Sequence, residues 1–202
     1  KKPIILSTGM ANENEIKKAI EILENNGSKD IILLHCISGY PTPLNETNIN
    51  TIPFFKKKFN KIIGLSDHTK SSVASMMACA VGAKVIEKHI TLDRSEGGVD
   101  SEFSLEPSEF KLMIENCKQA FNCLGNPGFD IKPSEKLNLK FRRSIYASKD
   151  IRSGEHLSED NIKVVRPGHG LDPSQYRKLL NGYKAINKIK FGTPINWGLL
   201  EN

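Results

Sequence analysis

The sequence predicts an α/β fold with a parallel sheet, followed by a second and smaller module. Four times between residues 3 and 125, a short apolar run leads through a polar loop into a helix-like segment. Residues 31–34 read Ile-Ile-Leu-Leu, an unbroken run that is typical of a strand covered on both faces. Beyond residue 140 the pattern changes to short strands and turns. Alternating strands and helices of the first kind pair in parallel, with the helices covering the sheet.

The first unit carries clear helix signals. We expect a strand over residues 3–6 and a helix that begins after Asn12, because Asn12 and Glu15 have the spacing of a capping box. Gly27 is a typical helix stop. Between these signals, apolar residues recur on one helical face: Ile16, Ala19, Ile20 and Leu23.

Three further strands are predicted over residues 30–36, 61–65 and 83–90, with helices over residues 71–81 and 107–124. Four strand–helix units are half of a (β/α)₈ barrel. Because a half-barrel has two open sheet edges, we expect it to be covered by another copy or by more of the same protein.

A linker and a compact module complete the chain. Residues 126–140 are rich in Gly, Pro and Lys, which is typical of a linker. The predicted domains are therefore 1–125 and 141–202, joined by this linker. Within the second domain we expect a strand over 144–147, a helix over 173–180, and closing segments over 184–189 and 194–197.

The composition excludes several classes of protein. With 38% hydrophobic and 26% charged residues, the chain suits a soluble globular protein. No apolar run approaches the roughly 20 residues that cross a bilayer, so we expect no membrane partner. The net charge of +6 favours an anionic substrate. Nucleic acid is not expected as a partner, because no nucleic-acid-binding module is recognisable.

The cysteines and the chain start give two further expectations. None of the four cysteines lies in a CxxC pair, and Cys79 and Cys117 fall in helix-like apolar patterns. Such thiols are typically reduced, which favours a cytoplasmic location. The sequence has no initiator Met and runs directly into a strand, so we expect residues to precede Lys1 in the intact protein.

Polar side chains follow two neighbouring strands. Residues 66–69 read Ser-Asp-His-Thr after the third strand, and residues 87–89 read Glu-Lys-His at the end of the fourth. Because consecutive strands of a barrel are neighbours, His68 and His89 can meet on one divalent ion acting as a Lewis acid. The alternative for the first segment is simple capping of the next helix. His35, in mid-strand, we interpret as structural.

Hydroxyl groups, a carboxylate and an arginine complete the candidate site. Ser7 and Ser38 adjoin glycines at strand ends, an arrangement that suits phosphate but also plain turns. Asp100, in the long loop 97–105, is the best carboxylate candidate. Arg166 precedes Pro and Gly in a rigid loop, where its planar guanidinium can hold an amide or a carboxylate. A plain surface arginine is the common alternative.

These pieces occur together in one family. The chain resembles the sialic acid synthases along its whole length, and the resemblance implies a (β/α)₈ TIM barrel followed by a small SAF (antifreeze-like, β-clip) domain. It implies that this chain supplies barrel strands five to eight plus the SAF domain, lacks the first half of the barrel, and is inactive by itself. The matching segments are 5–10, 34–36, 40–43, 64–69, 87–89, 104–107 and 166–168.

The resemblance also implies roles for individual residues. His68 and His89 match histidines that hold Mn²⁺ or Mg²⁺. Asp100 matches an aspartate of the catalytic and sugar site. Arg166 matches an arginine that reaches the sugar's N-acetyl group in the other subunit of a domain-swapped homodimer. Around phosphoenolpyruvate the matches are Ser7, Tyr40 and Ser66, with Ser38 standing where an Asn is found in N-acetylneuraminate synthases.

The loop over the site points to one branch of the family. Residues 98–105 read Gly-Val-Asp-Ser-Glu-Phe-Ser-Leu, which resembles the pseudaminic acid synthases. The implied reaction condenses phosphoenolpyruvate with the aldehyde of an open-chain diacetamido-hexose and releases phosphate. N-acetylneuraminate or legionaminate synthesis is the alternative. Two other classes stay open: a metal-dependent aldolase, and a non-catalytic SAF-type protein that binds carbohydrate or ice. Ice binding fits poorly, since residues 141–202 contain a single Thr.

Overall fold

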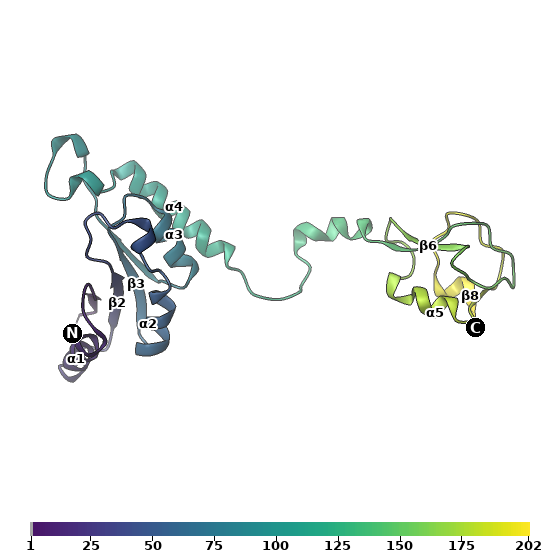
Figure 1. Cartoon of the computed structure of the whole chain (residues 1–202), viewed down its shortest axis with the longest axis horizontal. Helices are drawn as coiled ribbons and strands as arrows, with labels where there is room; N and C mark the ends of the chain where they lie inside the picture. The colour runs from purple at the N-terminus through teal and green to yellow at the C-terminus, as the bar shows by residue number, and fades with distance from the viewer. Residues whose placement is uncertain (1) are drawn as a thin grey trace. The chain divides into compact units, whose positions relative to one another are not determined.

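The computed structural model describes residues 2–202, which form two compact units, residues 1–126 and 127–202 (Figure 1). Each unit has its own hydrophobic core. No helix in the described chain is both long enough and apolar enough to cross a membrane.

The first unit is built on a four-stranded sheet in the order β1-β2-β3-β4. Every neighbouring pair is parallel, which confirms the predicted α/β class. The strands are β1 (Ile4–Ser7), β2 (Ile31–Cys36), β3 (Ile62–Asp67) and β4 (Val85–Lys88). The helices are α1 (Glu13–Asn25), α2 (Thr51–Phe59), α3 (Val73–Ala80) and α4 (Pro107–Cys123).

Helix α1 begins as the sequence predicts. The side chain of Asn12 accepts hydrogen bonds from the backbone N–H groups of Asn14 and Glu15, and the Glu15 carboxylate accepts one from the Asn12 N–H. This reciprocal capping box satisfies backbone donors that have no partner inside the helix. Ile16 and Ile20 are buried against the sheet, so the predicted apolar face is the one that packs.

Helix α2 was missing from the sequence-based prediction, which named no helix between the second and third strands. It has only nine residues, with Pro53 near its start and three consecutive lysines near its end. Only Ile52 and Phe55 are buried in it. Ile52, Phe55 and the partly buried Phe59 have the spacing of one helical face, so the sequence did carry a signal for this helix, and their packing into the core stabilises it.

One glycine fixes how closely two strands approach. A Cβ on Gly64 of β3 would lie 2.4 Å from the Val85 carbonyl oxygen and 2.5 Å from Leu34 Cδ2. Leu34 is fully buried, so its side chain covers the sheet where Gly64 leaves room. Any larger residue at position 64 would push β3 and β4 apart at the start of their pairing, where Gly64 is the register partner of Val85.

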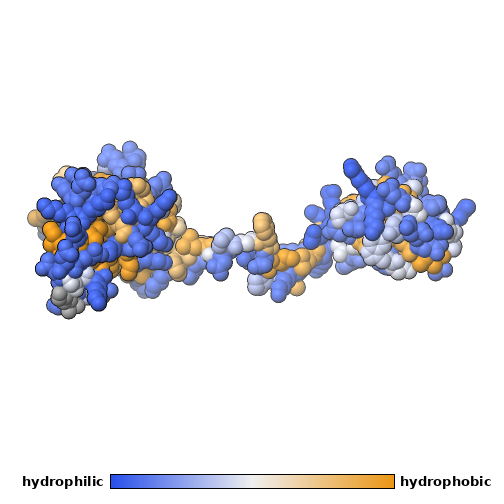
Figure 2. All heavy atoms as spheres, turned by 90° about the horizontal axis from the view of Figure 1, so that it is seen from below, coloured by the Kyte–Doolittle hydropathy of each residue, from blue (hydrophilic) through white to orange (hydrophobic). Residues whose placement is uncertain are grey.

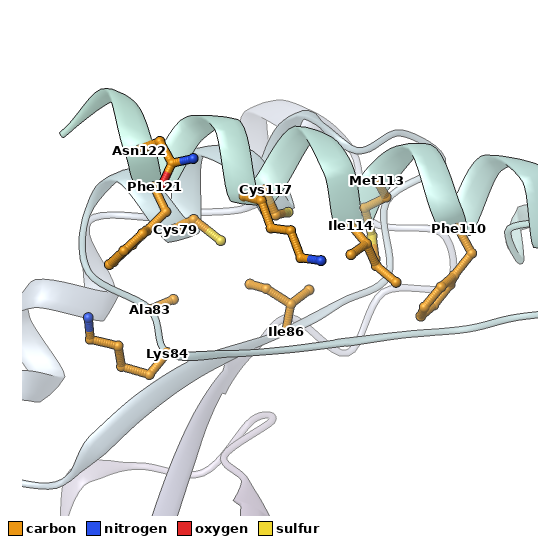
Figure 3. A pocket seen from close by; sticks show the side chains of 11 residues that line it. Cys79, Ala83, Lys84, Ile86, Phe110, Met113, Ile114, Cys117, Phe121 and Asn122 are labelled. Carbon is orange, nitrogen blue, oxygen red and sulfur yellow. The ribbon is translucent and has the colours of Figure 1, made fainter.

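The sheet has open edges and an apolar face that is partly exposed to solvent. Within residues 2–202, β1 and β4 each pair with one strand only. Ile5 and Ile62, on the sheet face away from the helices, are 54% and 51% exposed. Beside β4 lies a groove of about 660 Å³ under α4, lined mainly by apolar side chains such as Ile86, Phe110 and Phe121 (Figure 3). Apolar residues also reach the surface in the space-filling view (Figure 2).

These open edges predict self-association of the chain. Exposed strand edges and apolar surface of this kind are buried by association in water. Sedimentation of the 202-residue chain is expected to show a dimer or larger species. Ile5→Lys combined with Ile62→Lys should shift it toward monomer, whereas Phe54→Lys, on an equally exposed site of α2, should not. A wild-type chain that sediments as a stable monomer at micromolar concentration would contradict this prediction.

The second unit consists of short antiparallel pairs around a separate core. β5 (Ser144–Ala147) pairs with β6 (Ile162–Val165), and β7 (Lys184–Ala185) pairs with β8 (Leu200–Glu201). A 3₁₀ turn over Pro173–Gln175 leads into α5 (Tyr176–Leu180), where one helix was predicted. Of the predicted closing segment 184–189, only Lys184–Ala185 is a strand, and Ile189 forms an isolated bridge with Ile151. The closing strand β8 was not predicted.

The segment predicted as a linker contains regular structure. A 3₁₀ helix, η4, runs over Pro133–Phe141. Pro133 occupies its first turn, and the Lys132 N–H donates to Glu135 Oε2 over 2.7 Å. Gly and Pro near residue 126 predicted an irregular linker, but the proline here starts a helix because its fixed φ suits a first turn.

Candidate functional site

The ends of β3 and β4 carry two rows of paired side chains. Ser66 is the register partner of Glu87, and Asp67 is the partner of Lys88. Ser66 Oγ donates a hydrogen bond of 2.7 Å to Glu87 Oε1. Asp67 accepts one of 2.6 Å from Ser75 on α3, so the Asp67 row faces the helices. Because side chains alternate along a strand, the Ser66 row faces the opposite side, toward the inside of a barrel.

His68 and His89 follow these rows and lie together, as the strand order predicts. Their ring centroids are 5.2 Å apart, with the ring planes at 77°. His68 is 6% exposed. Its Nδ1 lies 2.9 Å from the Ile37 carbonyl oxygen and must carry the proton to donate there. The lone pair of His68 Nε2 is therefore available to a ligand.

Aromatic side chains surround the two imidazoles. The Tyr40 ring lies 4.3 Å from the ring of His68 and 6.1 Å from that of His89. The Phe103 ring is 5.1 Å from that of His89. Phe103 is buried, whereas Tyr40 is half exposed. Sequence reasoning placed Tyr40 here but did not single out Phe103, which a three-residue 3₁₀ turn after Asp100 brings to the site.

Asp100 joins the same group. Its Oδ2 lies 3.8 Å from His89 Nδ1, with both side chains about one-third exposed. The residue adopts a left-handed backbone conformation with φ of 66°, and Ser104 Oγ donates 2.7 Å to its carbonyl oxygen. The loop thus brings the predicted carboxylate to the histidine pair, where it can accept a hydrogen bond from an imidazole or from a sugar hydroxyl.

The side chains present suit part of a divalent-metal site. A metal-binding His usually donates its second ring nitrogen to a carbonyl or carboxylate, as His68 does to Ile37. Among residues 2–202, however, no group of three or more His, Cys, Asp and Glu is arranged to hold an ion. The chain therefore offers two imidazole ligands, and further ligands would have to be water, substrate or residues outside it.

The predicted phosphate-binding serines lie at the same end of the sheet. Ser7 ends β1 and is exposed. A Cβ on Gly9 would lie only 3.2 Å from Ser38 Oγ, which shows that the loops after β1 and β2 are in contact. The Ser66 hydroxyl donates its hydrogen bond to Glu87, so in this arrangement it does not point at a phosphate. To bind phosphate it must turn away from that carboxylate.

Glu87 was overlooked as an individual site residue. Its carboxylate is on the site face, exposed, and in register with Ser66. The signal was present in the sequence: counting two residues back from His89 along a strand gives the same face.

Arg166 belongs to the second unit. It is exposed, and it takes part in none of the ion pairs formed within residues 2–202. Its loop is held by Ser144, whose Oγ donates 2.8 Å to the Pro167 carbonyl oxygen and accepts 2.9 Å from the Gly170 N–H. The loop is thus built as rigidly as the sequence predicts, while a role of Arg166 toward the histidine site stays a prediction.

His35 has the structural role expected of it. The ring is 4% exposed, and its Nε2 lies 2.8 Å from the Thr47 carbonyl oxygen, to which it donates. Burial lowers the pKa of His35 below the ordinary 6.5, and the bond to Thr47 opposes this only in part.

The lowered pKa of His35 predicts a pH-dependent stability. The unfolded chain binds the proton more readily than the folded one, so the contribution is present above about pH 6.5 and is lost as pH falls below it. Urea unfolding midpoints of the wild type should fall between pH 7.5 and pH 5. In His35→Gln, which keeps an N–H donor, the fall should be smaller. His169→Gln, at an exposed site, is the control, and an identical pH slope in all three proteins would contradict the prediction.

Comparison with known proteins places this geometry in a family. Residues 1–128 match the NeuB family, and residues 142–201 match the SAF domain. The chain belongs to the NeuB family. It is 46% identical to the pseudaminic acid synthase of Campylobacter jejuni, over 98% of this chain and 57% of that protein. It is 42% identical to the N,N'-diacetyllegionaminic acid synthase of the same species, over 92% of this chain and 57% of that protein.

Solved structures of family relatives confirm the fold. A spore coat polysaccharide biosynthesis protein E from Chromobacterium violaceum matches all of this chain and 61% of its own, with 27% identity and a TM-score of 0.70. The N-acetylneuraminic acid synthetase of Leptospira borgpetersenii matches 68% of this chain and 48% of its own, with 36% identity and a TM-score of 0.62. The first unit is therefore the C-terminal half of a TIM barrel, and the second is an SAF domain. The chain spans about 57% of the length of the curated relatives it matches.

Proposed function

We propose that this chain is the C-terminal part of a synthase that condenses phosphoenolpyruvate with an open-chain diacetamido-hexose to give pseudaminic acid and phosphate. The observation that carries the proposal is the His68–His89 pair at the strand ends of a NeuB-family half-barrel. The Tyr40 ring lies against the ring of His68, and the Asp100 carboxylate lies beside His89. The 46% identity to a pseudaminic acid synthase and the residues 98–105 support the choice of sugar.

Each residue around the histidine pair has a role in the proposed reaction that follows from its position. His68 and His89 would hold a divalent metal ion, Mn²⁺ or Mg²⁺, which as a Lewis acid would polarise the aldehyde oxygen toward attack by the enol carbon. Asp100, beside His89, is placed to accept a hydrogen bond from the sugar. Tyr40 and Phe103 limit the approach of water to the imidazoles.

Phosphoenolpyruvate would lie across the ends of β1, β2 and β3. Ser7, Ser38 and Ser66 offer hydroxyl donors there, and holding the phosphate in place lowers the entropy lost on the way to the transition state. C3 forms the new C–C bond with the aldehyde carbon, and water adds to C2. The aldehyde oxygen takes one proton of this water and becomes a hydroxyl. The bond from C2 to the phosphate oxygen then breaks, so that phosphate leaves with the other proton and the water oxygen stays as the C2 ketone. Once phosphate has left, the Ser66 hydroxyl can again donate its hydrogen bond to Glu87, which it does here over 2.7 Å.

Two further features belong to the proposal. The SAF domain would place Arg166 over the site of the other subunit in a domain-swapped homodimer, where it would bind the N-acetyl group. All four cysteines are free, which supports a cytoplasmic enzyme.

The test uses the full-length protein, because a half-barrel lacks the other strand ends. Purified protein would be mixed with Mn²⁺, phosphoenolpyruvate and diacetamido-hexoses of either the pseudaminic or the legionaminic configuration. We expect phosphate release and a nonulosonic acid product detectable by mass spectrometry, faster with the pseudaminic precursor. The 202-residue chain alone should give neither.

The outcomes separate the alternatives. A faster reaction with the legionaminic precursor would favour the second candidate, which the 42% identity to a legionaminic acid synthase keeps open. Cleavage or addition without phosphate release would indicate a metal-dependent aldolase. Sugar binding without any turnover would indicate a carbohydrate-binding protein, and would contradict the proposal.

A further inference from the structure

The ends of β3 and β4 are joined by a buried ion pair that the proposed chemistry does not use. Lys88 Nζ lies 3.0 Å from Asp67 Oδ2, and each side chain is only 1% exposed. The two residues are register partners on adjacent strands. Asp67 immediately precedes His68 in the chain, and Lys88 immediately precedes His89.

Both members of the pair are fully hydrogen-bonded. Besides Asp67, Lys88 Nζ donates to the carbonyl oxygens of Thr69 and Ser71, the latter over 3.2 Å. Asp67 Oδ1 accepts from the Thr69 N–H over 2.8 Å, and Oδ2 accepts from Ser75 Oγ over 2.6 Å. The pair thus ties β4 to the segment 69–71, through which the chain leaves His68, and to helix α3.

Stability alone does not account for such a pair. Burial lowers the pKa of Lys88, and the nearby Asp67 carboxylate opposes that shift. Apolar residues of similar volume often stabilise a core as well as a buried ion pair does. An apolar pair cannot make directional hydrogen bonds. The hydrogen bonds of Asp67 and Lys88 fix the position of the backbone of each strand.

The second link between the same strands is of a different kind. Ser66 and Glu87 also bond across β3 and β4, but Glu87 is exposed and on the face where substrate would bind. That link can rearrange during a reaction. The Asp67–Lys88 pair, on the helix face, is shielded from solvent and substrate and keeps its geometry.

We propose that Asp67 and Lys88 are positioning residues that hold the imidazoles of His68 and His89 at the separation a shared ligand requires. The side chains of successive residues point to opposite faces, so fixing the pair on the helix face sets the backbone from which the two histidines project on the other. The statement about a metal ligand rests on the proposed function, whereas the statement about ring geometry does not.

The test removes both charges from the 202-residue chain, with Asp67→Leu and Lys88→Met together. Two properties are measured: the nuclear Overhauser effect between the ring protons of His68 and His89, and the Mn²⁺ dissociation constant by electron paramagnetic resonance. We expect the Overhauser effect to be lost and Mn²⁺ binding to weaken about 10- to 100-fold, as for other residues that orient metal ligands. The thermal midpoint should fall, because the buried Thr69 N–H and Ser75 hydroxyl lose their acceptor, and a single cooperative transition would show that the variant is folded.

A matched control removes an ion pair at the other end of the same strand, with Glu24→Leu and Lys61→Met. It should leave the ring contact and the Mn²⁺ affinity unchanged. If the Asp67 and Lys88 double variant does not fold, Lys88→Arg replaces it, because it keeps the charge but cannot place one nitrogen among three acceptors. It too should weaken the ring contact.

The results decide between positioning and mere packing. A folded variant that keeps both the Overhauser effect and the Mn²⁺ affinity would overturn the inference. A wild-type chain that binds no Mn²⁺ would show that the two imidazoles alone do not hold the ion, and the ring contact would then decide the positioning role by itself.

Discussion

Replacing His68 or His89 by alanine in the full-length protein is expected to lower kcat of the proposed condensation by about a thousandfold or more. The two imidazoles, 5.2 Å apart between centroids, are the two metal ligands that this chain supplies in our proposal. Loss of one would remove Lewis-acid stabilisation of the developing alkoxide, an effect of several kcal/mol, and about 4 kcal/mol corresponds to a thousandfold. Activity at saturating Mn²⁺ and at saturating phosphoenolpyruvate would be measured for both variants.

Two other histidines serve as controls for this experiment. His156→Ala changes an exposed residue of the SAF domain, and His35→Gln changes the structural histidine of β2 while keeping a donor toward Thr47. Both should retain most of the activity. If His68→Ala and His89→Ala were as active as these controls, and still depended on Mn²⁺, the ion would have to be bound elsewhere.

Much of the first unit could be predicted from the sequence because its signals are local. The capping box at Asn12 and Glu15 marks a helix start, and the unbroken apolar run 31–34 marks a strand buried on both faces. Parallel order then brings strand ends together, which is why His68 and His89 could be paired from the sequence. The family resemblance added the fold of the second unit, which its short strands do not specify.

The features that escaped prediction depend on contacts distant in sequence. Helix α2 exists because Ile52 and Phe55 find a core made by other elements. The Asp67–Lys88 pair joins residues 21 positions apart, and nothing in either segment states that both side chains will be buried. Ser66 was expected beside phosphoenolpyruvate, and nothing local indicated that its register partner Glu87 would accept its hydroxyl hydrogen. Register between strands, unlike a cap or an apolar period, is decided by the whole sheet.

Arg166→Ala in the full-length enzyme is expected to lower kcat/KM for the amino sugar by about 5- to 150-fold, with little change in phosphoenolpyruvate affinity. Arg166 is exposed on the SAF domain, in a loop that Ser144 fixes from both sides. In a domain-swapped dimer its guanidinium would bond an acetamido oxygen in the partner's site. One such bond lost to a buried partner corresponds to roughly 1–3 kcal/mol of transition-state binding.

Arg166→Lys tests whether charge or shape matters in this interaction. A lysine keeps the positive charge but not the planar fork, so it should be nearly as impaired as the alanine variant. Arg177→Ala, which removes another exposed arginine from the same domain, should leave the kinetics unchanged. Mixing inactive His68→Ala subunits with impaired Arg166→Ala subunits sharpens the test, because a swapped heterodimer contains one site with both residues intact. Recovery of about a quarter of wild-type activity is expected at equal mixing, since half of the dimers are then mixed and each has one competent site of two. No recovery after verified subunit exchange would show that Arg166 does not act across the dimer.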